Sequence, residues 1–239
     1  MNHRHLQPVG ASDLSLIPSK QSSVLDSVKM RLAQISELAT SKGWMSVIKE
    51  IIFLNRTAVV VEKDLSEIKE DSALLQALNM KVVEISRRML SSGSYHFAVR
   101  SRQLKASHYL DVGYGGFALV RRRQIIGDTW YIPPEATNNP RLLHKDLQRF
   151  GFKRWMGNHV YTFDIFVAPE ERKGKVAPAF QNEAMLLLRD KGYTKAFGFY
   201  WADNIPAHWC TRVTNKWKKL RAISVSRFLV FQRAVQRPE

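Results

Sequence analysis

The spacing of apolar positions changes repeatedly between a helical and a strand period, which predicts an α+β fold. Over residues 24–43 apolar side chains recur every three or four positions, so this segment is predicted to be an amphipathic helix. A short helix to about Leu54 and a strand over 57–61 are expected next. Residues 1–23 show little periodicity and are predicted to be a mobile tail.

The remainder of the chain alternates strand and helix patterns, after an acidic stretch over 62–71 that is predicted to be a solvated linker. Strands are predicted over 80–85, 117–121, 125–132, 160–167, 196–200, 221–225 and 227–231. Helices are predicted over 95–110, 142–150 and 176–191, and one more begins near Pro206. The long apolar block 44–61 is interrupted by Lys49, Glu50 and Arg56, so a membrane-spanning helix is not expected.

Composition places the chain among ordinary folded proteins. Of its 239 residues 45% are hydrophobic and 24% are charged, which argues against a wholly disordered chain. The single cysteine, Cys210, cannot form an intramolecular disulfide, and no secretory signal is visible. The expected compartment is therefore the cytoplasm.

Charge is unevenly distributed along the chain. The formal net charge is +16, and residues 91–239 carry 25 basic and 11 acidic side chains. Such an excess attracts anionic molecules, so an acidic partner for the C-terminal region is expected. Charge alone does not identify that partner.

The turn after the strand over 160–167 has the features of an anion site. It contains Arg172, Lys173, Gly174 and Lys175 and leads directly into a helix. Unpaired N–H groups and the positive end of the helix dipole bind phosphate at such a position. Basic loops before helices are also common solvated features, so this turn does not identify a ligand by itself.

The residues from Asp164 to Ala177 resemble motif A of the GNAT acyltransferase superfamily. In that family the loop has the form Arg/Gln-x-x-Gly-x-Gly/Ala, with Arg172 and Ala177 matching its ends and Lys175 standing where a glycine is usual. Downstream, Asp203-Asn204-Ile205-Pro206-Ala207 is similar to the family's helix start. Asn215 then takes the place where a left-handed residue is expected.

The resemblance implies an acyl-CoA N-acyltransferase fold over 79–233, with a mixed, mostly antiparallel sheet whose central strands splay apart. Residues 24–78 would be an N-terminal extension that matches nothing in the family. The donor would be acetyl-CoA or another acyl-CoA, and the acceptor an amine. The implied donor-binding residues are Ile165, Phe166, Val167, Arg172, Lys173, Gly174, Lys175, Val176, Ala177, Asn204 and Ala207.

The resemblance implies direct attack of the amine on the thioester, which needs a stabilised oxyanion and a proton for the leaving thiolate. Asp164 and Asn204 are expected near the acyl group. The tyrosine that often donates the proton in this family is missing, so Cys210 or His208 is the candidate, although both residue types are more often structural. No His, Cys or acidic spacing marks a metal site, and none is expected.

Two other functions stay open. The same fold without catalysis would bind nucleic acid or an acidic membrane through its basic surface. A transferase would also be compatible with a carrier protein or aminoacyl-tRNA as donor. The acceptor, the acyl chain length and the oligomeric state are not determined by the sequence.

Overall fold

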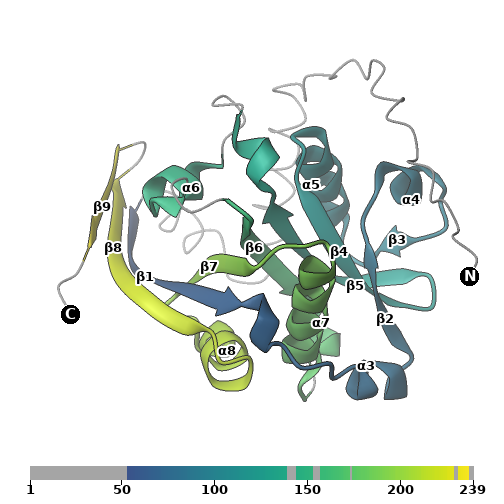
Figure 1. Cartoon of the computed structure of the whole chain (residues 1–239). Coiled ribbons are helices and arrows are strands. Elements are labelled where there is room, and N and C mark those ends of the chain that lie inside the picture. The colour runs from purple at the N-terminus through teal and green to yellow at the C-terminus, as the bar shows by residue number, and fades with distance from the viewer. Residues whose placement is uncertain (1–52, 139–143, 153–156, 173, 229–230, 237–239) are drawn as a thin grey trace, which may run out of the picture.

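The structure is a computed structural model that describes residues 53–138, 144–152, 157–172, 174–228 and 231–236. The expected tail over 1–23 and the expected helix over 24–43 lie outside these residues. Within them, nine strands form one mixed sheet with helices on both faces (Figure 1). The expected α+β class is confirmed.

The described strands are β1 (Phe53–Asp64), β2 (Met80–Glu84), β3 (His96–Phe97), β4 (Gly115–Arg121), β5 (Gln124–Ile132), β6 (His159–Val167), β7 (Lys195–Trp201), β8 (Lys218–Phe228) and β9 (Phe231–Gln236). The α-helices are α3 (Ala73–Ala77), α4 (Arg87–Ser91), α5 (Arg100–Asp111), α6 (Lys145–Arg149), α7 (Val176–Asp190) and α8 (Ile205–His208). Short 3-10 segments are η1 (Leu65–Glu67), η2 (Pro134–Asn138) and η4 (Pro169–Glu171), and η5 (Trp209–Thr214) is π-helical.

Neighbouring strands follow the order β2-β4-β5-β6-β7-β1-β8-β9, and β3 joins the sheet beside β5. The pairs β6–β7 and β3–β5 are parallel, and the other pairs among the described strands are antiparallel. Parallel neighbours need a long crossover, and α7 supplies it between β6 and β7. The carboxyl ends of these two strands therefore lie at the same edge.

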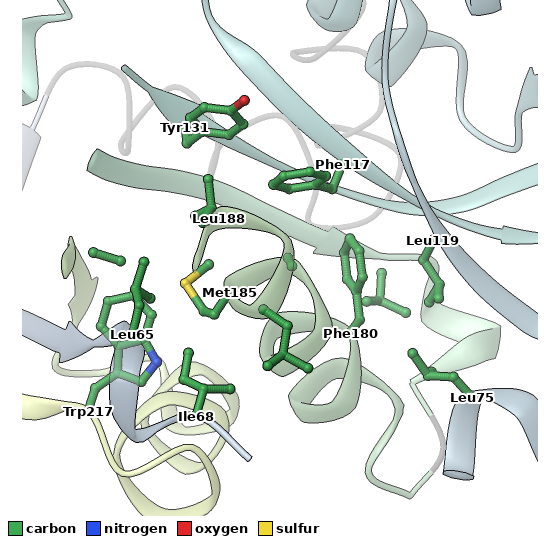
Figure 2. Close-up of a cluster of buried hydrophobic side chains, with 14 of the residues drawn as sticks. Leu65, Ile68, Leu75, Phe117, Leu119, Tyr131, Phe180, Met185, Leu188 and Trp217 are labelled. Carbon is green, nitrogen blue, oxygen red and sulfur yellow. The ribbon is translucent and has the colours of Figure 1, made fainter. Parts of the chain in front are cut away.

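Helix α7 covers one face of the sheet together with α3 and η1. Its buried side chains recur at helical spacing: Val176, Phe180, Ala184, Met185 and Leu188. Figure 2 shows Phe180 and Leu188 lying against Phe117 and Tyr131 of the sheet. Burying a side chain such as Phe180 contributes about 2–3 kcal/mol, so this stripe fixes α7 and the turn before it.

Helices α4, α5 and α6 cover the opposite face. Met89 of α4 and Ala106 of α5 pack with Trp130, whereas Leu147 of α6 packs with Tyr161 and Phe197. The two faces of β6 and β7 consequently meet different helices: α7 on one side, and α5 with α6 on the other (Figure 1).

Strand β1 lies inside the sheet, between β7 and β8, although 24–78 was expected to be an extension. The linker expected over 62–71 is wrong, because its first three residues belong to β1 and both Leu65 and Ile68 are buried in the α7 core. These two apolar residues anchor the acidic stretch to the sheet. Residues 53–78 thus share a sheet and a core with the residues that follow.

Several boundaries also differ from the prediction. Phe53 and Leu54 start β1 instead of ending a helix. The helix expected over 95–110 begins at Arg100, because the preceding residues pair with β5 as β3. The last strand begins at Phe231, since β8 continues to Phe228. The other expected strands, including the hairpin of β4 and β5, are confirmed.

Candidate active site

The candidate site forms where β6 and β7 separate. The two strands pair over three residues, up to Tyr161 and Phe197, and their register ends there. Thr162 Oγ1 still donates to the Phe197 carbonyl at 3.1 Å. A Cβ atom added to Gly198 would lie 3.2 Å from the Thr162 carbonyl oxygen, so glycine allows this close approach at the point of separation.

Beyond this point lies a cavity of about 440 Å³, a size typical of small-molecule sites. Both faces of the sheet contribute to its walls. From the side of α7 and α8 come Val61, Thr162, Gln181, Met185, Gly198, Tyr200, Asn204, Ala207, Thr211 and Trp217. From the side of α5 and α6 come Lys105, Tyr109, His144, Lys145, Asp146, Phe163, Phe199 and Trp201. Asp164 and Ile165 line it from β6, and Thr129 from β5.

A bulge in β6 shapes the middle of this cavity. Phe163 pairs with Trp130 and Phe166 pairs with Asp128, so two residues of β6 lie opposite Thr129 alone. The first of them, Asp164, has a φ of 52°, a left-handed conformation that aspartate tolerates better than most residues. Such a bulge interrupts the ladder and turns main-chain groups away from the neighbouring strand.

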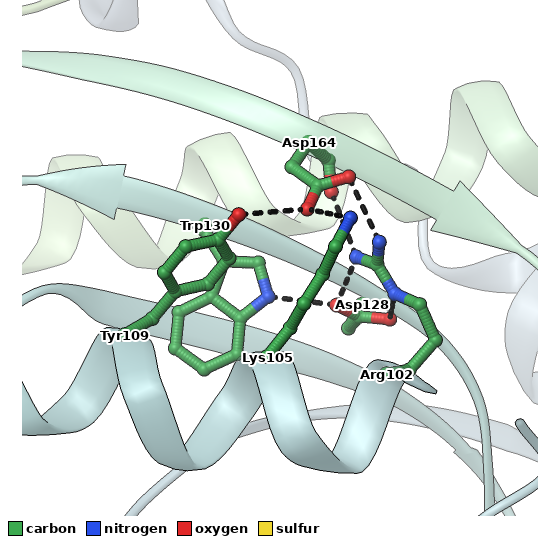
Figure 3. A network of polar contacts seen from close by, with 6 residues as sticks. All are labelled: Arg102, Lys105, Tyr109, Asp128, Trp130 and Asp164. Carbon is green, nitrogen blue, oxygen red and sulfur yellow. Dashed lines mark hydrogen bonds and ion pairs between the residues drawn. The ribbon is translucent and has the colours of Figure 1, made fainter. Parts of the chain in front are cut away.

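The bulge places Asp164 in an ion-pair network with α5 (Figure 3). Its Oδ1 atom accepts from Arg102 Nη1 at 2.8 Å, and its Oδ2 atom accepts from Lys105 Nζ at 3.0 Å and from the Tyr109 hydroxyl at 3.2 Å. Arg102 also donates to both carboxylate oxygens of Asp128, one of them from Nε at 2.9 Å. Every oxygen of the two carboxylates therefore has a partner.

Opposing effects set the charge of these two aspartates. Burial alone would raise the pKa of Asp164, but the charges of Arg102 and Lys105 outweigh it and lower this pKa to about 2. Burial raises the pKa of Asp128 above its usual value, and Arg102 acts against that change. Asp164 is thus an ionised structural partner of two cations and is unsuited to accepting a proton near pH 7.

The turn between β6 and α7 holds most of the expected diphosphate residues. Gly174 has a φ of 59°, and a Cβ atom there would meet open space. Lys175 is the N-cap of α7 and makes no side-chain cap bond within the described residues, while Val176 and Ala177 form the first turn. The helix N-terminus is therefore not capped by this side chain. Lys173 lies outside the described residues.

Arg172 is already engaged by the protein. Its Nε atom donates to the Val167 carbonyl at 2.7 Å, and its guanidinium lies 5.7 Å from the Phe166 ring centroid. These contacts fix the start of the turn, so Arg172 positions the loop besides contributing charge. Gly174, Lys175 and Val176 also line a second hollow of about 540 Å³ beside Arg121.

Known proteins resemble this chain in structure and not in sequence. No protein-family model matches it, and no curated protein matches it. A GCN5-related glucosamine N-acetyltransferase region of a fungal multi-domain β-N-acetylglucosaminidase superposes on 80% of this chain and 23% of that chain, with a TM-score of 0.51 and 14% identity. This chain has the GNAT fold.

Two further solved structures are more distant. A Drosophila protein covers 80% of this chain and 57% of its own, with 7% identity and a TM-score of 0.46. A GCN5-related N-acetyltransferase from Sphaerobacter thermophilus covers 84% and 59%, with 8% identity and a TM-score of 0.45. The chain thus spans less than two thirds of each of these three structures.

Asn204 follows β7 in this GNAT fold and begins α8. Its Oδ1 atom accepts from the Ala207 N–H at 3.2 Å, which caps the helix. Both residues line the cavity, and their expected contact with the donor stays a prediction. Since Oδ1 is engaged in the cap, Nδ2 is the group of Asn204 that can donate to a bound molecule.

Cys210 is poorly placed for catalysis. It is not among the described residues that line the cavity, and its Sγ atom donates to Gln181 Oε1 at 3.6 Å. Burial raises the pKa of its thiol to about 12. Asn215 donates to the same Gln181 oxygen at 2.7 Å, so Cys210 belongs to the contact between η5 and α7.

The left-handed residue expected at Asn215 is found one position later. Asn215 has a φ of −90°, whereas Lys216 has a φ of 53°. The turn after η5 thus contains a left-handed residue, as expected, but that residue is Lys216 and not Asn215.

Sequence reasoning missed several titratable cavity residues, among them Lys105, Tyr109, Asp146, His144 and Tyr200. His144 precedes α6 in a loop without any motif. Tyr200 lies on β7 and its hydroxyl is 2.9 Å from His208 Nδ1. The sequence named His208 as a candidate proton donor. It gave no such indication for Tyr200, whose spacing is that of an ordinary core residue on a strand.

Within the described ranges, no group of three His, Cys, Asp or Glu side chains is placed to hold a metal ion. In the same part of the chain, no helix is long and apolar enough to cross a bilayer.

Proposed function

We propose that this protein is an N-acyltransferase that transfers an acetyl or other acyl group from acyl-CoA directly to an amine. The observation that carries the proposal is the cavity between the diverging ends of β6 and β7, which both faces of the sheet line. Donor and acceptor then reach one reaction point from opposite sides, so neither displaces the other.

The side of α7 and α8 suits the pantetheine arm of the donor. The cavity residues described on this side carry no charge, and beyond Tyr161 the β7 edge of β6 is no longer paired. Main-chain groups of Ile165, Phe166 and Val167 are thus proposed to bind the amides of pantetheine. The open first turn of α7 at Val176 and Ala177 would take the diphosphate.

Charge supports the same orientation of the donor. Lys175 is exposed at the N-terminus of α7, and Arg172 lies three residues earlier in the preceding turn. Lys173 is proposed as a further diphosphate contact, because the sequence resemblance implies it. The basic surplus over 91–239 would also attract a polyanionic donor, or another acidic partner.

The proposed reaction is aminolysis of a thioester. The neutral amine nitrogen attacks the acyl carbon, the C–N bond forms, and the C–S bond breaks as the thiolate leaves. Main-chain N–H groups at the Asp164 bulge would stabilise the intervening oxyanion. Tyr200, which lines the donor side as Asn204 does, would protonate the thiolate; the attacking nitrogen loses a proton to solvent, and Tyr200 regains one from solvent. Asp164 would position α5 rather than move a proton.

Acetyl-CoA binding tests the donor site first. Calorimetry should show saturable binding that is at least tenfold weaker in Lys175→Glu, because a like charge would face the diphosphate. Lys219→Glu is the matched control, since this exposed lysine is on β8 and does not line the cavity. Equal weakening in both variants would indicate only a change of overall charge.

Transfer is then measured as CoA release with a panel of amines: D-glucosamine, benzylamine, spermidine, a lysine-containing peptide and hydroxylamine. D-Glucosamine is included because the fungal structure is described as a glucosamine N-acetyltransferase. Release that depends on an amine supports the proposal. Salt-sensitive nucleic-acid binding without CoA binding would instead favour the binding-protein function. The cytoplasm is the proposed compartment, given the single cysteine.

A further inference from the structure

His144 lies on the acceptor side of the cavity, where α6 begins. It is the N-cap of α6, and its Nδ1 atom accepts from the Asp146 N–H at 3.3 Å. Its ring centroid is 4.7 Å from that of Phe163 and 5.9 Å from that of Tyr161. The imidazole is thus held in an aromatic corner of the cavity wall.

The Asp146 carboxylate is fixed beside the same ring nitrogen. Asp146 Oδ2 lies 3.5 Å from His144 Nδ1 and accepts from the Tyr161 hydroxyl at 3.3 Å. Arg149 Nη1 lies 3.1 Å from the other oxygen. Since Nδ1 faces Asp146, Nε2 is the nitrogen left for a molecule in the cavity, and no partner of Nε2 is found among the described residues.

The charges around His144 allow both protonation states. Burial is the largest effect and lowers the pKa of the imidazole, and Lys145 and Arg149 lower it further. Asp146 and Asp164 act in the opposite direction. The ring is therefore neutral near pH 7, and Asp146 can stabilise the imidazolium once it forms.

The other polar groups on this side are committed elsewhere. Lys105 and Tyr109 both donate to Asp164, which is held ionised by its cations. Lys145 is a cation and cannot accept a proton in that state. His144 is left as the cavity group that combines a neutral state with an oriented carboxylate.

We propose that His144 is the general base that removes the proton from the acceptor ammonium, and that Asp146 is its positioning residue. This inference rests on the proposed acyl transfer. To act as a base, the neutral ring takes the tautomer that carries its proton on Nδ1: the Nδ1–H then gives up the Asp146 N–H and pairs with Asp146 Oδ2, 3.5 Å away, and Nε2 carries the lone pair. The acceptor nitrogen gives its proton to His144 Nε2, and the neutral amine attacks the thioester. The proton then passes to solvent, and no further reactant is needed.

The test compares amines that do and do not carry a proton at pH 7. His144→Asn keeps an N-cap oxygen for α6 but cannot titrate, so the helix should persist. With benzylamine, or the most rapidly acylated cationic amine of the panel, kcat/KM at pH 7 should fall about 100-fold or more. With hydroxylamine, which is neutral at that pH, the loss should stay below about tenfold.

Controls separate a base from a wall residue. Acetyl-CoA affinity should be unchanged in His144→Asn, and His96→Gln, which alters an exposed histidine on β3, should leave all rates unchanged. Asp146→Asn should move the acidic limb of the kcat/KM profile to lower pH by destabilising the imidazolium. Equal losses with both amines, or an unmoved profile, would overturn the inference. If the unsubstituted protein acylates no amine of the panel, the proposed function itself fails.

Discussion

The two sides of the cavity are built from different kinds of groups. On the side of α7 and α8 the described lining residues are uncharged, and polar groups there come from neutral side chains such as Tyr200 and Asn204 and from the main chain. On the side of α5 and α6 the wall contains Lys105, His144, Lys145 and Asp146, and Asp164 lies at the boundary. In the proposed function the uncharged side takes the pantetheine arm of the donor and the charged side takes the acceptor amine.

The two sides of the cavity are also stabilised by different interactions. The α7 side depends on apolar packing around Phe180, whereas α5 is tied to the sheet through the buried ion pairs of Arg102. Apolar packing tolerates small changes of volume, but a buried charge that loses its partner is costly. Substitutions should therefore have unequal effects on the two sides.

The largest expected effect is on stability, from Asp128→Ala. It leaves Arg102, whose side chain is 7% exposed, with Asp164 as its remaining carboxylate partner. Loss of one partner from such a buried pair costs about 3–5 kcal/mol of unfolding free energy. Urea denaturation measures it. The control, Asp111→Ala, breaks the more exposed pair with Arg87 and should cost below about 1 kcal/mol. Equal losses of unfolding free energy in Asp128→Ala and Asp111→Ala would show that the buried ion pairs do not stabilise this side more than a surface pair does.

The elements on the α7 side of the cavity could be predicted from the sequence because their signals are local. A buried strand, a basic turn with Gly174 and the stripe of α7 are contiguous over 160–190, and all are found as expected. Asn204 and Ala207 likewise lie on the cavity because the motif that contains them is a helix start. Local backbone geometry is what short sequence patterns encode.

The α5 side of the cavity could not be predicted because its contacts join distant positions. Arg102 contacts Asp128 and Asp164, which lie 26 and 62 residues away in the sequence, and no local sequence pattern indicates contacts at such separations. Strand β1 was expected over 57–61, but its place between β7 and β8 depends on partners more than 130 positions away. His144 became a candidate only when the fold brought β6 beside it.

The second expected effect concerns pH and the Asp164 ion pairs. The folded pKa of Asp164 is about 2, below the unfolded value of about 3.9, so the unfolded state binds more protons. The resulting stabilisation, on the order of 2 kcal/mol, is complete above about pH 5 and is lost as pH falls towards 2. Asp164→Asn should therefore flatten the dependence of unfolding free energy on pH in that window.

The control for this measurement is Asp190→Asn, which alters an exposed aspartate at the end of α7. It should leave the acid slope almost unchanged. A slope that survives in Asp164→Asn would show that the charged side of the cavity does not depend on this carboxylate.

A smaller effect is expected on donor binding from Gly198→Val. Its side chain would press on the Thr162 carbonyl where β6 and β7 separate, and would narrow the α7 side of the cavity. Acetyl-CoA should bind at least tenfold more weakly by calorimetry, equivalent to about 1.4 kcal/mol. Gly157→Val is the matched control, because a Cβ atom there meets open space. Unchanged binding in Gly198→Val would place the donor elsewhere.

The smallest effects concern Asn204, which caps α8 and also lines the cavity. Two substitutions separate these roles. Asn204→Ala removes the oxygen that accepts from the Ala207 N–H and should cost about 1 kcal/mol of stability. Asn204→Asp keeps that oxygen and loses the Nδ2 donor, so stability should hold. Acetyl-CoA affinity should then fall by about 2–10-fold, the equivalent of one hydrogen bond. If Asn204→Asp binds acetyl-CoA as tightly as the unsubstituted protein, Asn204 caps α8 and does not contact the donor.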